Sequence, residues 1–145
     1  MNLFSVAVTH LRTQAIPRIG IAVIAALLLP GCSRPTGRDL SPAKINALLS
    51  DSLVVVLDVR TPSEWQSETG HLDRAILIPV QELDDRIGEL EAFRKDTIIA
   101  YCRSGQRSAI AADLLRQHGF TAFNMEGGIL RWNDEQRPVT REQQP

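Results

Sequence analysis

The chain has few cysteines, no cluster of metal-binding residues and no excess of positive charge, and each absence excludes a class of protein. Its 145 residues include two cysteines, Cys32 and Cys102. Histidine, cysteine and acidic residues do not occur with the spacing of a metal site, so we expect no bound metal. The 16 basic residues face 17 acidic ones without forming a basic stripe, which argues against nucleic-acid binding.

The sequence also lacks internal repeats, low-complexity tracts and an apolar run long enough to span a membrane. The longest such run, residues 19–29, is too short for a hydrocarbon core of about 30 Å. Arg12 and Arg18 precede or flank it without any acidic residue, and Leu29-Pro30-Gly31-Cys32 closes it. A positive start, a short apolar core and a small-residue end are typical of a secretory signal. We therefore predict a signal peptide over residues 1–31, the alternative being a buried helix.

Removal of residues 1–31 would leave a chain long enough for one compact core, and the loss of two arginines would bring its net charge from −1 to −3. We predict a tether over residues 32–40, a folded domain over 41–138 and a disordered tail over 139–145. If Cys32 is modified, Cys102 is the only free thiol and no intramolecular disulfide can form.

The residues that end at Cys32 resemble the lipobox of bacterial lipoproteins, in which the cysteine carries lipid and becomes the mature N-terminus. The resemblance implies lipidation of Cys32 and a domain anchored on the periplasmic side of a bacterial membrane. Ser33, which is not an aspartate, implies the outer membrane in a host that has one. Pro30 is unusual in this motif, and an uncleaved membrane anchor is the alternative outcome.

Apolar runs alternate with segments of helical spacing through the rest of the chain. This alternation predicts an α/β fold in which helices flank a small, mostly parallel sheet. In such a sheet, functional residues lie beyond the carboxyl ends of the strands. We expect strands at residues 53–57, 75–78, 97–101 and 121–124, and helices at 42–50, from 61, at 82–93, at 108–118 and from 128.

Cys102 follows the strand predicted at residues 97–101, in a short polar loop. The loop contains Arg103, Gly105 and Arg107, and helix-forming sequence follows from Ser108. Loop N–H groups, the positive end of the helix dipole and two arginines all favour a thiolate at Cys102. Because the thiolate is the nucleophilic form, we predict that Cys102 is a catalytic nucleophile. The alternative is a buried structural cysteine at a strand end.

Four separated motifs follow one another along the chain. They are Asp58-Val59-Arg60 with Glu64-Trp65, Gly70-His71-Leu72 with Ala75 and Ile78-Pro79, the loop from Tyr101 to Ser108, and Gly127-Gly128 with Trp132. In this order they resemble the motifs of the single-domain rhodaneses, a family of sulfurtransferases. Two positions depart from the family pattern: Arg74 stands in place of glycine and Leu77 in place of asparagine.

The resemblance implies a rhodanese-like fold and sulfur transfer through a persulfide on Cys102, with no metal or organic cofactor. An anionic donor such as thiosulfate would supply the sulfur, and cyanide or a thiol would accept it. We also expect a monomer that binds no nucleic acid, as its charge balance indicates, and that contacts the membrane through the lipid implied at Cys32. The implied substrate-binding residues are Arg103, Ser104, Gly105, Gln106, Arg107 and Ser108, with Asp58 and Arg60 in support.

Two other functions stay open. A small phosphatase or arsenate reductase is disfavoured because such enzymes use Cys-x5-Arg, whereas Cys102 and Arg107 form Cys-x4-Arg. A module that carries or senses sulfane sulfur, or docks a partner without turnover, is the second alternative.

We expect Arg107 to fold over the sulfur and Arg103 to point toward solvent. His71 is expected to make a structural hydrogen bond.

Overall fold

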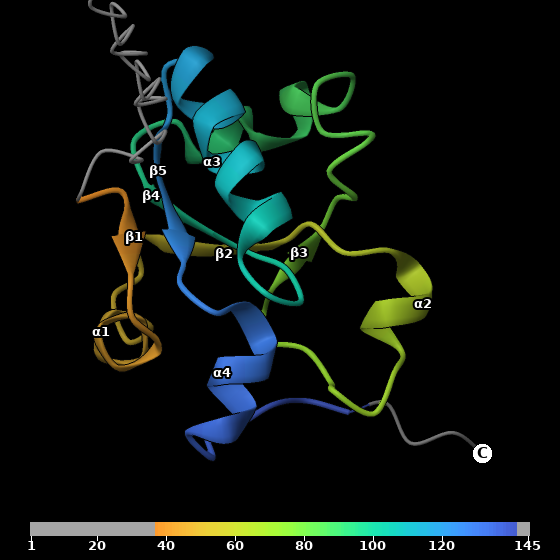
Figure 1. Ribbon diagram of the computed structural model, residues 1–145. Coiled ribbons are helices and arrows are strands. Elements are labelled where there is room, and N and C mark those ends of the chain that lie inside the picture. The colour runs from red at the N-terminus through yellow and green to blue at the C-terminus, as the bar shows by residue number, and fades with distance from the viewer. Residues whose placement is uncertain (1–36, 142–145) are drawn as a thin grey trace, which may run out of the picture. The chain divides into compact units, whose positions relative to one another are not determined.

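Five parallel strands form the centre of the computed structural model, which describes residues 37–141 (Figure 1). Their order across the sheet is β1-β5-β4-β2-β3, so the predicted parallel α/β architecture is confirmed. The strands are β1 (Asp39–Leu40), β2 (Val54–Asp58), β3 (Ile76–Leu77), β4 (Thr97–Tyr101) and β5 (Thr121–Met125).

The alternating side chains of β4 pack into two different apolar clusters, one on each face of the sheet. Ile98 and Ala100 face a cluster that contains residues of α3 (Gln106–Gln117). Ile99 and Tyr101 face a cluster that contains residues of α1 (Pro42–Leu48) and α4 (Gly128–Asp134). All four β4 side chains are buried, which explains why the strand reads as a continuous apolar run.

Capping residues in the sequence explain where two of the helices begin. Ser41 caps α1, and Pro42 occupies its first turn. At α2 (Pro62–Trp65) the capping box is complete, because the Thr61 side chain accepts the N–H of Glu64 and the Glu64 side chain accepts the N–H of Thr61. α3 begins at Gln106, two residues before the predicted start.

Three elements differ from the prediction. The helix expected over 82–93 is a 3₁₀ helix, η1 (Ile87–Phe93), preceded by turns; it lacks a side-chain cap and contains Gly88. The strand expected over 75–78 shortens to β3. Residues 39–40, assigned to the tether, instead form β1, which pairs with Asn124 and Met125 on β5. Two residues are too few to show a strand periodicity.

The disordered tail predicted from residue 139 is wrong for residues 139–141. The backbones of His71 and Thr140 exchange two hydrogen bonds of 2.8 and 2.9 Å, and Trp132 Nε1 donates to the carbonyl of Pro138 at 2.9 Å. The two bonds to His71 hold a polar segment whose composition alone indicates disorder. Residues 142–145 lie outside the described residues, as do the predicted signal peptide, Cys32 and residues 33–36 of the tether.

No helix within residues 37–141 combines the length and the apolar character needed to cross a bilayer.

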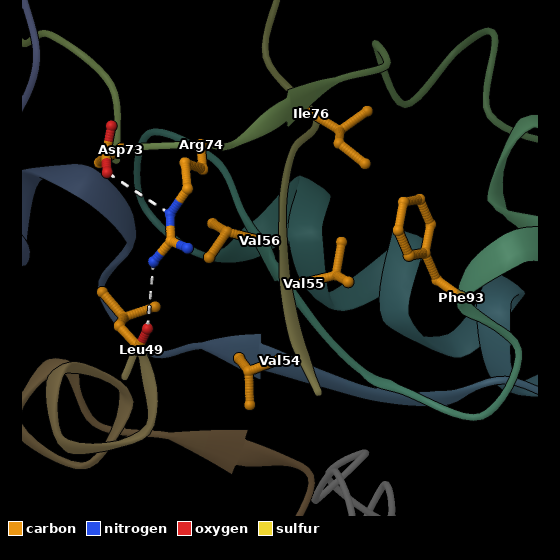
Figure 2. A pocket seen from close by; sticks show the side chains of 8 residues that line it. All are labelled: Leu49, Val54, Val55, Val56, Asp73, Arg74, Ile76 and Phe93. Carbon is orange, nitrogen blue, oxygen red and sulfur yellow. Dashed lines mark hydrogen bonds and ion pairs between the residues drawn. The ribbon is translucent and has the colours of Figure 1, made fainter. Parts of the chain in front are cut away.

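Both departures from the rhodanese pattern lie at the edge of the sheet beside β3. Leu77 pairs with Asp58 in register, so β3 forms without the asparagine. Arg74 has φ of 53°, a conformation that favours glycine. Its guanidinium lies 3.4 Å from the carbonyl oxygen of Leu49 and 3.5 Å from the carboxylate of Asp73 (Figure 2). The side chain thus borders a mainly apolar surface cavity of about 350 Å³, lined also by Val54, Val55, Val56, Ile76 and Phe93.

Substitutions at Arg74 separate backbone strain from side-chain contacts. Arg74→Gly and Arg74→Ala both remove the guanidinium, but only alanine keeps a Cβ at positive φ. We expect the glycine variant to have a free energy of unfolding about 1 kcal/mol above that of the alanine variant, after allowance for glycine's greater chain entropy. Urea unfolding of the two variants measures the difference. A glycine variant no more stable than the alanine variant would show that the positive φ at position 74 does not strain the backbone.

Candidate active site

Cys102 lies immediately after β4, the central strand of the sheet, at the edge formed by the carboxyl ends of the strands. The two neighbouring strands, β2 and β5, pair with β4 along almost its whole length. The cysteine is buried, with 1% of its surface exposed, and the loop that follows it leads directly into α3. The thiol therefore lies at the end of the central strand of the sheet, and the loop that follows it supplies neighbouring residues.

Hydrogen-bond donors of the loop surround the sulfur. The N–H of Gly105 donates to Sγ at 3.1 Å. Burial by itself raises the pKa of the Cys102 thiol, but hydrogen bonds from the Ser108 hydroxyl and from the N–H groups of Ser108, Ser104 and Gly105 outweigh it, and the pKa is lowered. The site therefore favours the thiolate, the form that attacks sulfur.

Ser108 links the sulfur to a buried polar group on β5. Its hydroxyl lies 2.6 Å from Asn124 Oδ1, and Asn124 Nδ2 donates to Asp39 Oδ1 on β1 at 2.8 Å. The single hydroxyl proton has two competing acceptors, Asn124 Oδ1 and the sulfur. The N–H of Ser108 has no such competition, so the backbone donors are the more secure part of the thiolate's stabilisation.

Two glycines allow the chain to close around the loop. Gly105 caps α3 with φ of 95°, and a Cβ there would lie 3.1 Å from the carbonyl oxygen of Met125. Gly128 begins α4 with φ of 59°, and a Cβ there would lie 2.4 Å from the carbonyl oxygen of Cys102. Because glycine has no Cβ, α4 can approach the loop closely enough for the N–H groups of Ile129 and Leu130 to donate to the carbonyls of Cys102 and Arg103, at 2.9 and 3.1 Å. The start of α4 thus fixes the backbone of the loop at Cys102 and Arg103 through their carbonyl groups.

Arg107 is held by a carboxylate from another element. Its Nη1 and Nη2 donate to the two carboxylate oxygens of Glu64 at 2.7 and 2.6 Å. The hydrogen bond from Arg107 is the largest cause of the lowered pKa of Glu64, about 2, against the opposing effect of burial. Glu64 likewise raises the pKa of Arg107, and the charge of Cys102 and a hydrogen bond to it raise it further. The guanidinium is therefore bound to the carboxylate and lies near enough to the thiol for their charges to interact.

The other loop side chains differ in exposure. Arg103, Ser104 and Gln106 are exposed, and Arg103 makes no ion pair or side-chain hydrogen bond with any residue in the described part of the chain. Its exposure agrees with the expected orientation toward solvent. The structure brings Ser104, Gly105 and Ser108 to the sulfur through their N–H groups.

Asp58 and Arg60 form a buried ion pair beside the loop rather than within it. Arg60 Nη2 lies 2.6 Å from Asp58 Oδ2, and both side chains are at most 1% exposed. Arg60 also donates to Thr69 Oγ1 and to the carbonyl of Gly70. Within residues 37–141, the hydrogen bonds to the Asp58 carboxylate come from Arg60, so it does not orient the loop donors. The pair instead joins the end of β2 to the turn at residues 69–70.

His71 and the tryptophans belong to the packing around the site. The ring of His71 stacks on Trp65 with centroids 3.7 Å apart, and its Nδ1 lies 3.0 Å from the carbonyl oxygen of Leu72. Trp132 is fully buried in the cluster under α4. Within residues 37–141, histidine, cysteine and acidic side chains do not gather in any group of three that could hold a metal ion.

Sequence reasoning missed the part that Glu64 plays at the site. The sequence placed Glu64 only in a helix cap and in the motif that starts at Asp58. Its contact with Arg107 spans 43 positions. The signal that could have found it was the position of its motif after β2, since the carboxyl ends of neighbouring parallel strands meet at one edge.

The fold and the site define a class: parallel α/β proteins that present a thiol in a tight loop after a central strand. Residues 41–135 match the family model described as the rhodanese-like domain, and the chain belongs to that family. A rhodanese-related protein from Thermoplasma volcanium has the same fold, with a TM-score of 0.66 and 34% identity, over 72% of this chain and 99% of that one.

The names of the curated relatives refer to activities, and they differ from one another. The thiosulfate sulfurtransferase PspE of Escherichia coli is 36% identical over 73 residues, which are 50% of this chain and 68% of the relative. The tRNA uridine(34) hydroxylase of Chlamydia muridarum is 27% identical over 133 residues, 85% of this chain and 40% of the relative. The chain spans well under half the length of the hydroxylases that it matches.

Proposed function

We propose that the protein is a sulfurtransferase that moves a sulfane sulfur atom from thiosulfate, or a similar donor, to cyanide or a thiol through a persulfide on Cys102. The observation that carries the proposal is the environment of Sγ, where backbone N–H groups and the Ser108 hydroxyl lower the pKa of a buried thiol. The similarity to a thiosulfate sulfurtransferase that the chain covers over 68% of its length supports it.

The first step transfers one sulfur atom to the enzyme. The Cys102 thiolate attacks the outer sulfur of thiosulfate, a new S–S bond forms, and the old S–S bond breaks with its electron pair on the departing sulfite. The terminal sulfur of the persulfide then carries the negative charge. In this proposal, the N–H groups of Ser104, Gly105 and Ser108 that lower the pKa of the thiol also stabilise this anion.

The second step returns the thiolate. Cyanide attacks the terminal sulfur, the S–S bond breaks, and its electron pair returns to Sγ as thiocyanate leaves. A thiol acceptor would take the sulfur in the same way and become a persulfide. Neither step needs an outside oxidant or reductant, and the residues of the loop suffice for both.

A carrier or sensor of sulfane sulfur is the second candidate. The burial of Cys102 favours it, because 1% exposure limits the access of free small molecules to the sulfur and so favours slow exchange over rapid turnover. The match to one segment of longer relatives also suits a module that serves a partner. A phosphatase is less well supported, because the Cys-x4-Arg loop closes tightly around one sulfur atom.

Thiocyanate formation tests the proposed activity. The full chain is incubated with thiosulfate and cyanide, and thiocyanate is measured over time, with aryl phosphate hydrolysis followed in parallel. We expect thiocyanate to form catalytically and the phosphate ester to stay intact. A persulfide that forms but is not removed faster by any acceptor would support the carrier, and faster phosphate release would support the phosphatase.

We also propose that residues 1–31 direct export and that Cys32 carries the lipid that anchors the domain on the periplasmic side. Several acyl chains anchor firmly, since each buried CH₂ contributes about 0.8 kcal/mol. Cys32→Ser is expected to move the protein to the soluble fraction or to leave an uncleaved precursor. Fractionation and gel mobility of the two proteins measure this. A variant that behaves like the wild type in both would show that Cys32 is not lipidated.

A further inference from the structure

The Arg107–Glu64 pair joins α2 to the start of α3, next to the loop that begins at Cys102. Two parallel hydrogen bonds of 2.7 and 2.6 Å join the guanidinium and the carboxylate, and their side chains are 30% and 27% exposed. The carboxylate is itself fixed, because Glu64 Oε2 accepts the N–H of Thr61 at 3.1 Å in the capping box of α2. α2 therefore determines where the Arg107 guanidinium lies relative to the loop.

The pair alters the charge that an incoming sulfur donor meets. The carboxylate cancels most of the field of Arg107 at a distance, because the two charges lie within hydrogen-bond contact. Arg103 is exposed and makes no ion pair within residues 37–141. A donor therefore meets one free cation on the loop, because the charge of Arg107 is compensated by Glu64.

We propose that Glu64 is a positioning residue that sets donor selectivity: it holds Arg107 beside Cys102 as a neutral pair and leaves Arg103 to attract the donor. This inference rests on the proposed sulfur transfer. A site with one uncompensated cation attracts a dianion such as thiosulfate less than a site with two. The pair thus reduces the advantage of dianionic donors over singly charged ones.

Glu64→Gln tests the charge with little change in shape. Glutamine is also a capping-box residue, so α2 is expected to keep its start. At low ionic strength we expect kcat/KM for persulfide formation to rise about fivefold with thiosulfate and about twofold with a singly charged arenethiosulfonate, through KM. The assay pH lies well above the thiol pKa, so that the thiolate fraction stays constant.

Two variants serve as controls. Glu89→Gln removes the carboxylate from a bidentate pair of the same kind with Arg86, on η1, and should leave the donor ratio unchanged. Glu64→Asp retains the charge and shortens the side chain, and should keep the wild-type ratio. Equal changes for both donors in Glu64→Gln, or the same ratio shift in Glu64→Asp, would overturn the proposal.

Arg103→Gln gives an independent test if Glu64→Gln does not fold. The side chain is exposed, so the fold should tolerate the change. We expect this variant to lose most of the salt dependence of persulfide formation from thiosulfate; a retained salt dependence would show that Arg107 meets the donor and would overturn the proposal. Because the assays follow the first step, a failure of transfer to cyanide would contradict the proposed turnover without affecting the donor ratio.

Discussion

Cys102→Ser is expected to abolish sulfur transfer, with the rate of thiocyanate formation falling by at least about a thousandfold. Serine preserves the size of the side chain and the N–H donors around it. Its hydroxyl is not ionised near neutral pH and forms no persulfide, so both steps are lost. Thiocyanate production by wild-type and variant protein under identical conditions measures the effect.

The fold should survive this change, because one small side chain replaces another in the same loop. Equal circular dichroism and thermal unfolding of the two proteins would show that the loss is chemical. Ile110→Ser, on the exposed face of α3, is a matched substitution outside the site and should retain wild-type turnover. Turnover by Cys102→Ser at the wild-type rate would exclude the cysteine as the nucleophile.

The same assay has an expected pH dependence. The pKa of Cys102 is lowered from that of an ordinary thiol by the hydrogen-bond donors around Sγ. Activity that depends on the thiolate should therefore rise with pH, with a midpoint below the pKa of an ordinary thiol.

Gly128→Ala is expected to have the largest effect on stability, a loss of about 3 kcal/mol in the free energy of unfolding. The new Cβ would lie 2.4 Å from the carbonyl oxygen of Cys102 and 2.5 Å from that of Arg103, both of them backbone atoms. The positive φ of 59° adds its own cost. α4 must move away, and the hydrogen bonds from Ile129 and Leu130 that hold the loop must lengthen.

Gly88→Ala is the control for this substitution. Gly88 lies in η1 without positive φ, and a Cβ there has no neighbour within 4 Å. Chemical unfolding of the two variants compares them directly. We expect Gly88→Ala to stay within about 0.5 kcal/mol of the wild type. A Gly128→Ala protein of equal stability would show that the close approach of α4 to the loop is not required.

The sequence predicts the parts of this fold that depend on local patterns. The apolar runs predicted as strands at 53–57 and 97–101 correspond to β2 (Val54–Asp58) and β4, and the capping residues Ser41 and Thr61 precede α1 and α2. It does not predict β1, whose two residues form a strand only because β5 offers a free edge. The bridge between His71 and Thr140 is likewise invisible, since it joins segments 69 positions apart.

At the site, the sequence predicts the hydrogen-bond donors around the sulfur, because those N–H groups belong to residues close to Cys102 in the chain. The pattern that predicts them is a strand, then the cysteine, a glycine-containing loop and a helix. It does not predict the partners that other elements bring. Glu64 meets Arg107 from α2, and the Asp58 carboxylate binds Arg60 rather than the loop. Such contacts depend on how the connections after β2 and β4 pack together at one edge of the sheet.

The most direct measurement of the central claim is the mass of the cysteine peptides after the full chain has been incubated with thiosulfate and then with cyanide. We predict that the peptide containing Cys102 gains the mass of one sulfur atom with thiosulfate and loses it rapidly on addition of cyanide, as thiocyanate appears. Cys32→Ser protein should behave in the same way. A Cys102 peptide that stays unmodified while thiocyanate forms would contradict the persulfide mechanism.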